Sequence, residues 1–201
     1  MQKINELYKQ MNDFDYGWID KTGYKYINKI AKDKFIPDYY LQNPKDLDET
    51  KIGICWDQVE YERKYFEKLD IPFKTIFIVY DDGIKYPNHT FLIFKKRKKY
   101  YWFENTYSNA KGILEFNNLQ ELYDRVKKEF MKENKLEEIG EKIFWYVYDK
   151  PKYGIGAIDF ITHCQKGIKA DGNLKNIDIW YRTKKTDNLK LSVFHLILNF
   201  K

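Results

Sequence analysis

The stretch from His89 to Glu104 constrains the fold most, because it has the pattern of a β-hairpin. Two segments rich in β-branched and aromatic residues, HTFLIF and KYYWFE, flank the basic stretch KKRK. If residues 95–98 form the loop, Phe94 pairs with Lys99, and His89 lies directly opposite Glu104. Directly opposed residues of an antiparallel pair share one face of the sheet, with Cβ atoms about 4.5–5.5 Å apart. The sequence therefore predicts that Glu104 can hold the His89 imidazole in one orientation.

The length of the loop decides which side chain meets His89. A loop one residue shorter or longer turns Glu104 to the other face and can bring Asn105 opposite His89 instead. Both a carboxylate and an amide can orient an imidazole. Glu104 and Asn105 are therefore both candidates for this role.

Cys55 stands at the start of an expected helix. After GICWDQV, apolar residues recur at the three-to-four spacing of a helix with one buried stripe, which ends before Pro72. A cysteine at a helix N-terminus is favoured as a nucleophile, because free N–H groups and the partial positive charge stabilise its thiolate. The alternative is an inert core cysteine, since free cysteine is among the most buried residue types. With His89 and an orienting group downstream, the pattern indicates a nucleophile and its base.

These motifs resemble the transglutaminase-like core of the papain-like cysteine enzymes. GICWDQV matches the family's Gly-x-Cys-Trp motif, NHTFLIF its histidine at the start of a strand, and YYWFENTY its tryptophan-containing strand that ends in an acid. The resemblance covers about residues 50–116. It implies that Cys55 is the nucleophile, His89 the general base and Glu104 the orienting acid, where that family usually has aspartate.

The resemblance implies a thiol-dependent acyl-transfer enzyme, a cysteine peptidase, amidase or transglutaminase-like enzyme, that acts on a peptide or protein through an acyl-enzyme. The backbone N–H of Cys55 is the expected first oxyanion-hole donor, and the sequence assigns no second donor. Trp56 is a candidate wall of the substrate site, although a tryptophan in an apolar stripe is more often core. Two alternatives stay open: a catalytically silent transglutaminase-like binding module, and a thioester-dependent N-acyltransferase.

The rest of the chain predicts a single α+β domain, with helices flanking an antiparallel sheet. We expect an N-terminal helical segment, a transglutaminase-like core and a C-terminal extension that shapes the substrate cleft, over residues 1–50, 50–140 and 141–201. Helices are expected near 4–11, near 23–34, after Asn117 or Asn118, and from about Ala157. Further strands are expected at 74–80, 112–116 and 142–148, and in NIDIWY and LSVFHLIL.

The cysteine content and the hydrophobic pattern indicate the cellular compartment of the protein. Two cysteines among 201 residues do not make a disulfide scaffold, and no apolar run has transmembrane length. The first residues lack the continuous apolar core of a signal peptide. We therefore expect a cytoplasmic protein without a membrane partner, and the sequence does not indicate its oligomeric state.

Charge and short motifs argue against other classes of site. The net charge of +6 comes from 36 basic and 30 acidic residues, so the surface is mixed, and the run KKRKK is expected to be a solvated hairpin tip rather than a nucleic-acid site. The neighbours His163 and Cys164 lack zinc-site spacing, and Cys164 is expected to be buried in a helix. His195 is expected in a core or strand, and KPKYGIGA lacks the phosphate-loop pattern. The sequence thus predicts neither a metal nor a cofactor.

Overall fold

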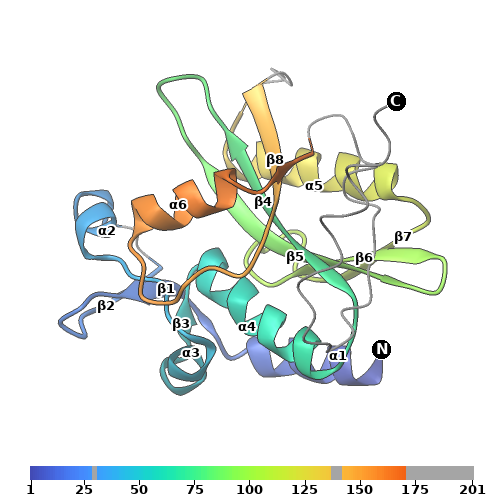
Figure 1. The fold of residues 1–201 in the computed structure, drawn as a ribbon, viewed down its shortest axis with the longest axis horizontal. Helices are drawn as coiled ribbons and strands as arrows, with labels where there is room; N and C mark the ends of the chain where they lie inside the picture. Colours follow the sequence, from blue (N-terminus) through green and yellow to red (C-terminus); the bar gives the residue numbers. More distant parts are fainter. Residues whose placement is uncertain (29–30, 137–141, 171–201) are drawn as a thin grey trace, which may run out of the picture.

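A six-stranded antiparallel sheet forms the centre of the fold (Figure 1). The computed structural model describes residues 1–28, 31–136 and 142–170. Along the sheet the strands are β7 (Gly112–Phe116), β6 (Lys99–Glu104), β5 (Asn88–Lys96), β4 (Phe73–Tyr80), β8 (Ile143–Tyr148) and β9 (Ile168–Lys169). The predicted α+β class with an antiparallel sheet is confirmed.

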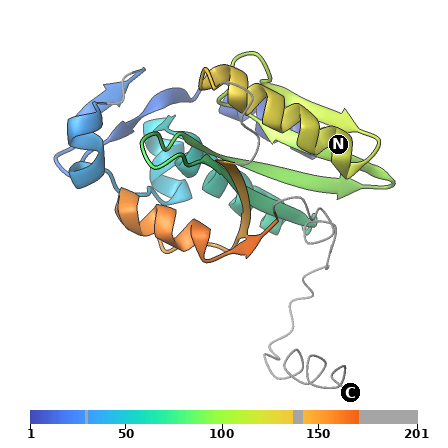
Figure 2. The same cartoon turned by 90° about the horizontal axis from the view of Figure 1, so that it is seen from above.

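Both faces of this sheet are covered. In β4, Ile76 and Ile78 belong to one hydrophobic cluster, whereas Phe77 and Val79 belong to another, because successive side chains point to opposite faces. Figure 2 shows α5 (Leu119–Glu133) on one face and α4 (Cys55–Lys68) with α6 (Ala157–Gln165) on the other. Burial on both faces explains why this strand is a continuous apolar run.

The helices after β7 and β8 begin close to where the sequence places them. The side chain of Asn118 caps α5 by accepting a hydrogen bond from the Glu121 N–H at 2.9 Å, so Asn118 is the cap rather than Asn117. Helix α6 begins at Ala157 as expected. The segments NIDIWY and LSVFHLIL, with His195, lie outside the described residues.

Helix α4 lies between the large sheet and the N-terminal elements, and it starts at Cys55 as predicted (Figure 1). The prediction of one buried stripe is wrong. The buried residues surround most of the helix and include polar ones: Cys55, Trp56, Asp57, Gln58, Val59, Glu60, Glu62, Arg63 and Phe66. Arg63 pairs with Glu60 at 2.8 Å and donates to Thr75 Oγ1 at 2.6 Å, which compensates part of their burial.

The N-terminal segment contains strands as well as helices. It contains α1 (Gln2–Met11), β1 (Asp15–Ile19), β2 (Lys25–Ile27), α2 (Lys32–Asp38), α3 (Pro44–Thr50) and β3 (Ile52–Gly53), and β2, β1 and β3 form a small sheet in that order. The helix expected near 23–34 is wrong, because β2 pairs with β1 there. Trp18 and Tyr26 are opposed across that pair, and their rings stack with centroids 4.1 Å apart, which favours the strand.

Helix α3 lies in a segment that the sequence indicates as irregular. Pro44 occupies the first helical turn, where its missing N–H costs no hydrogen bond. The Asn43 side chain caps the helix by accepting from the N–H groups of Lys45 and Asp46 at 2.9 and 3.1 Å. The proline therefore starts a helix here instead of excluding one.

The hairpin loop between β5 and β6 has two residues, so the expected four-residue loop is wrong. Phe94 pairs with Tyr101, and Lys96 pairs with Lys99, which leaves Arg97 and Lys98 as the loop. Arg97 takes a positive φ of 58°. Because the loop is shorter by two residues, the pairing shifts by an even number and Glu104 stays on the face expected for it.

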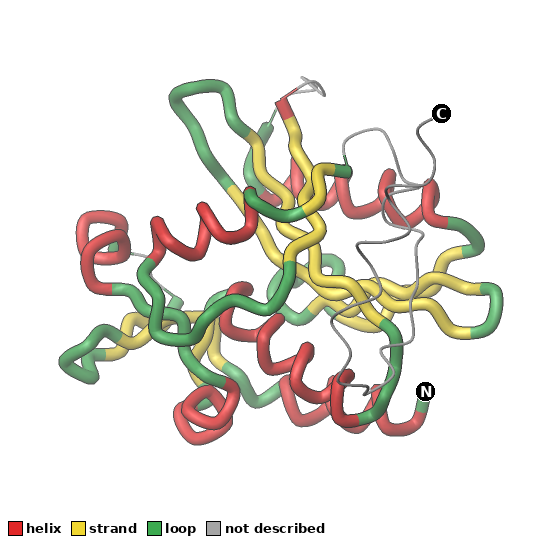
Figure 3. The backbone as a smooth tube through the Cα atoms, viewed as in Figure 1, coloured by secondary structure: helices red, strands yellow, loops and turns green. Residues whose placement is uncertain are grey.

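A longer loop, residues 81–87, connects β4 and β5 (Figure 3). The expected turn at DDG is present, since the Gly83 N–H donates to Asp81 Oδ1 at 2.9 Å.

Over the described ranges of the chain, no helix is both long and apolar enough to span a membrane.

Candidate functional site

Cys55 is the first residue of α4, and its position depends on a close contact of Gly53 with Leu47 and Asp57. Strand β3 pairs in parallel with β1 and leads directly into the helix. A Cβ added to Gly53 would lie 2.7 Å from Leu47 Cδ1 and 2.9 Å from Asp57 Cβ, so only glycine fits without a shift. The Cys55 side chain is 5% exposed and forms no disulfide.

Asp57 holds the start of α4 in place. Its Oδ2 accepts from the Ile54 N–H at 3.1 Å, and its Oδ1 accepts from the Gln42 N–H at 2.9 Å and the Tyr39 hydroxyl at 3.0 Å. Burial raises the pKa of Asp57 to about 7, against the opposing effect of these hydrogen bonds. The sequence analysis did not single out Asp57, although an acid in the first helical turn is a common capping signal.

His89 and Glu104 form a buried pair. His89 Nε2 lies 2.8 Å from Glu104 Oε2, and the two residues are 2% and 1% exposed. Glu104 Oε1 accepts three further hydrogen bonds, from the Thr106 N–H, the Thr106 hydroxyl and the Tyr107 N–H, at 2.7, 2.8 and 2.9 Å. The turn after β6 thus fixes one oxygen of the carboxylate and directs the other toward His89.

The charges of this pair stabilise each other. Burial alone would lower the pKa of His89, but the charge of Glu104 and hydrogen bonds to Cys55 and Glu104 raise it to about 10. Burial alone would raise the pKa of Glu104, yet His89 and the N–H groups of Thr106 and Tyr107 hold it below its usual value. The pair is therefore an imidazolium beside a carboxylate at neutral pH.

The structure brings Cys55 to the same imidazole. Glu104 occupies Nε2, and Cys55 also contributes to the raised pKa of His89, so the thiol lies near the same ring. The Tyr107 ring stacks on His89 with centroids 4.0 Å apart and an interplanar angle of 20°, which restrains the imidazole from the side. Cys55, His89 and Glu104 thus form one contiguous group.

Asn105 points elsewhere. Its Nδ2 donates to Gln58 Oε1 at 2.8 Å and to the Met11 carbonyl at 3.1 Å. Because successive strand residues face opposite sides of the sheet, Glu104 and Asn105 cannot both reach His89. The structure therefore brings Glu104, and not Asn105, to the imidazole.

Trp56 lies in an aromatic cluster and is 3% exposed. Its ring stacks on Phe160 of α6 with centroids 4.6 Å apart, and its indole N–H donates to Asn88 Oδ1 at 3.0 Å. Asn88 precedes His89, so this bond ties the start of β5 to the start of α4. The role of Trp56 as a wall of the substrate site stays a prediction.

Sequence reasoning missed Tyr16, a partly buried residue of β1. Burial, followed by the proximity of Cys55 and Glu104, raises the pKa of its hydroxyl well above the usual value. No local motif marks this residue among the 18 tyrosines of the chain. Only the pairing of β1 with β3 brings it to Cys55.

The other cysteine behaves as the sequence predicts. Cys164 is fully buried in α6, and burial raises the pKa of its thiol. His163 is half-buried, and its Nε2 lies 2.8 Å from the Asp149 carbonyl oxygen. In the part of the chain that the structure describes, no cluster of three or more His, Cys, Asp or Glu side chains could hold a metal ion.

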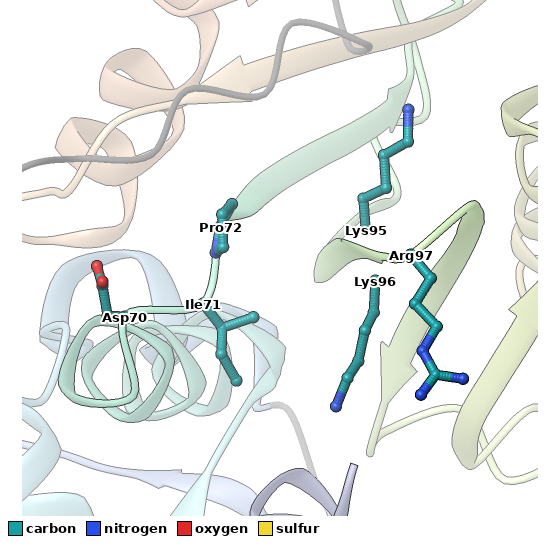
Figure 4. Close-up of a pocket in the computed structure, with 6 residues that line it drawn as sticks. All are labelled: Asp70, Ile71, Pro72, Lys95, Lys96 and Arg97. Atoms are coloured by element: carbon teal, nitrogen blue, oxygen red, sulfur yellow. The ribbon is translucent and has the colours of Figure 1, made fainter.

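A hollow of about 420 Å³ lies at the tip of the β5–β6 hairpin (Figure 4). It is lined by Asp70, Ile71, Pro72, Lys95, Lys96 and Arg97. Asp70 follows the C-terminal end of α4, whereas Cys55 begins this 14-residue helix, and such a helix is about 20 Å long. This basic hollow is therefore separate from the group around Cys55.

Compared with known protein families and with curated proteins, the chain matches none. Any function assigned to the group around Cys55 must therefore come from its chemistry. That chemistry comprises a thiol at a helix N-terminus, an imidazolium whose pKa that thiol helps to raise, and a carboxylate that orients the imidazolium.

Proposed function

We propose that Cys55, His89 and Glu104 are the catalytic triad of a thiol-dependent acyl-transfer enzyme with a transglutaminase-like core. The observation that carries the proposal is the 2.8 Å contact between His89 Nε2 and Glu104 Oε2, made by an imidazole whose pKa is raised in part by Cys55. A nucleophile, a base and an orienting acid in this order are the requirements of covalent acyl transfer. Burial of the whole group strengthens its electrostatic interactions.

The elements that carry the triad support the resemblance to transglutaminase-like enzymes. Cys55 starts a helix packed on an antiparallel sheet, His89 lies at the start of one strand, and Glu104 ends the neighbouring strand. Continuing the observed pairing places Glu104 diagonally from His89, and diagonal neighbours are farther apart, at about 7–8 Å, than directly opposed residues. The longer side chain of glutamate bridges this distance, which explains a glutamate where that family usually has aspartate.

The proposed reaction uses the Cys55 thiolate as nucleophile, next to the imidazolium of His89. The raised pKa of His89 keeps its proton at neutral pH, and the N-terminus of α4 stabilises the negative sulfur. The Cys55 thiolate attacks a carbonyl carbon, a C–S bond forms, and the carbonyl π electrons move to oxygen. When that oxygen reforms the double bond, the leaving group departs with the proton of His89.

The second half of the reaction reverses these steps. Water or an amine attacks the acyl-enzyme, His89 accepts its proton, and the C–S bond breaks to restore the thiolate. Glu104 keeps its charge throughout and holds the imidazole through Nε2. Its Oε1 is held by three donors, so the carboxylate does not need to reorient.

A peptide or protein is the substrate class that fits this chemistry and the resemblance. The two alternative functions predict different reactivity of Cys55. A thioester-dependent N-acyltransferase would be acylated by thioesters but not by peptide amides. A binding module would hold the same fold but have an unreactive Cys55.

The deciding experiment is the pH dependence of iodoacetamide alkylation at Cys55, mapped by peptide, in wild type and in His89→Ala. Cys164 of the same molecule is an internal control, since its buried thiol has a raised pKa. In wild type, we expect Cys55 to be alkylated at pH values well below about 8.5, the ordinary pKa of a cysteine. In His89→Ala, the pH midpoint of alkylation should move up toward that value. Slow alkylation of Cys55 that is the same in both proteins would contradict the enzyme and support a binding module.

A further inference from the structure

Tyr107 contacts both the base and the acid of the triad. Its ring stacks on the His89 imidazole with centroids 4.0 Å apart and an interplanar angle of 20°. Its backbone N–H donates to Glu104 Oε1 at 2.9 Å. One residue therefore supports the face of the imidazole and holds one oxygen of the carboxylate that orients it.

The turn after β6 fixes Tyr107 in this position. The Tyr107 carbonyl accepts the Ala110 N–H at 2.9 Å, so hydrogen bonds hold its main chain on both sides. The half-buried ring packs against the hydrophobic cluster that contains Phe91 and Trp102. The ring is therefore held against His89 by a hydrogen-bonded turn.

A stacked ring affects the charge of the imidazole as well as its orientation. The face of an aromatic ring is negative, and it attracts a cation that lies within about 6 Å of the ring centroid. The attraction is stronger where water is excluded, and His89 is only 2% exposed. The Tyr107 ring therefore favours the imidazolium over the neutral imidazole, against the effect of burial.

We propose that Tyr107 is a positioning residue of the triad, whose ring favours the charged form of His89 and fixes its orientation, while its N–H holds Glu104. The inference rests on the acyl-transfer function proposed above. The imidazolium is needed in that reaction, because it stabilises the Cys55 thiolate before attack and then protonates the leaving group. A neutral or tilted imidazole would do neither.

The contribution of the ring can be separated from those of the titratable groups around His89. These groups are Glu104 on β6 and Cys55 and Glu62 on α4. A substitution at Tyr107 changes none of these side chains. It also keeps the backbone N–H that binds Glu104, so only the ring is removed.

The test compares Tyr107→Leu, which removes the aromatic face, with Tyr107→Phe, which retains it. In Tyr107→Leu we expect the His89 pKa, followed through histidine ¹⁵N chemical shifts by NMR, to fall by about 0.4–1.5 units. With p-nitrophenyl acetate as the acyl donor, kcat should fall about 2- to 30-fold at an unchanged KM. Tyr107→Phe should rescue both the His89 pKa and kcat.

Tyr123→Leu is the matched control. Tyr123 is also half-buried and packs against the same hydrophobic cluster, but its ring stacks on Trp145, with centroids 4.4 Å apart. Its substitution removes a comparable aromatic contact away from the imidazole. The His89 pKa and kcat should therefore stay at their wild-type values.

The outcomes separate this inference from the proposed function. A wild-type His89 pKa and kcat in Tyr107→Leu, with acylation lost in His89→Ala, would overturn the role of Tyr107 alone. Equal losses in Tyr107→Leu and Tyr107→Phe would also overturn it, because the aromatic face would then not be their cause. If Cys55 of the wild type is not acylated, the proposed enzyme fails together with this inference. Should Tyr107→Leu not fold cooperatively, Tyr107→Met is a second variant without the ring, and the same fall in the His89 pKa is required of it.

Discussion

The carboxylate of Glu104 reaches His89 diagonally across the β5–β6 pair, at 2.8 Å from Nε2, rather than from the directly opposed position. The two-residue loop at Arg97 and Lys98 causes this offset. The backbones of His89 and Glu104 are therefore farther apart than those of a directly opposed pair, and the length of the glutamate side chain is needed to bridge them.

The first prediction concerns the side-chain length and the charge of Glu104. Glu104→Asp should withdraw the carboxylate from Nε2, and Glu104→Gln should keep the length but remove the charge. Because the charge of Glu104 raises the pKa of His89, we expect that pKa to fall by more than one unit in both variants. Histidine ¹⁵N chemical shifts followed by NMR over pH measure the change directly.

A matched control for these variants is Glu115→Gln. Glu115 accepts the Tyr101 hydroxyl at 2.7 Å and is remote in the sheet from His89. Its substitution should leave the His89 pKa unchanged. An unaltered His89 pKa in Glu104→Gln would show that the carboxylate does not set the charge of the imidazole.

Much of the site is readable from sequence because its determinants are local. Cys55 at a helix start and His89 at a strand start follow from the residues around them. The face of Glu104 is predicted correctly even with the wrong loop length, since an error of two residues preserves the alternation of the strand. The exact register was hidden because no glycine or asparagine marks the two-residue turn, and Arg97 adopts the positive φ instead.

The parts that sequence reasoning missed depend on contacts between distant segments. Tyr16 reaches Cys55 only through the pairing of β1 with β3. Glu60 and Arg63 look like surface charges in a helical pattern, yet they are buried because elements cover α4 on more than one side. Helix α3 was missed because Pro44 indicates both a loop and a first helical turn.

The second prediction separates Asn105 from Glu104. Asn105→Ala removes the hydrogen bonds to Gln58 and to the Met11 carbonyl, and leaves these buried groups without that partner. We expect a loss of about 1–3 kcal/mol in the free energy of unfolding, measured by urea denaturation. The pH midpoint of Cys55 alkylation should stay at its wild-type value. A shifted midpoint in a folded Asn105→Ala protein would return Asn105 to the list of orienting candidates.

The third prediction is a pH dependence of stability that belongs to His89. Its pKa is raised to about 10 in the folded protein, against about 6.5 in an unfolded chain. This stabilisation is complete below pH 6.5 and is lost as the pH rises through 10. Between pH 7 and 8.5, the free energy of unfolding should therefore fall by up to about 1.4 kcal/mol per pH unit.

The slope that belongs to His89 is the difference between wild type and His89→Gln, because other buried acids also lose stability as the pH rises. Burial raises the pKa of Glu62 well above its usual value, and it raises the pKa of Asp57 to about 7. His89→Gln should flatten the slope, whereas His163→Gln, at a half-buried histidine outside the site, should not. Equal slopes in wild type and His89→Gln would show that His89 is not charged in the folded protein.

The fourth prediction tests the approach of β3 to α4. Gly53→Ala places a methyl group within 3 Å of Leu47 and Asp57, so the start of the helix must move. We expect a loss of about 1–3 kcal/mol in the free energy of unfolding and slower alkylation of Cys55 at neutral pH, because the thiol moves away from His89. Gly156→Ala is the control, since its added Cβ meets only the Tyr39 carbonyl at 3.8 Å. If Gly53→Ala keeps wild-type stability and Cys55 reactivity, the close contact at Gly53 does not position the nucleophile.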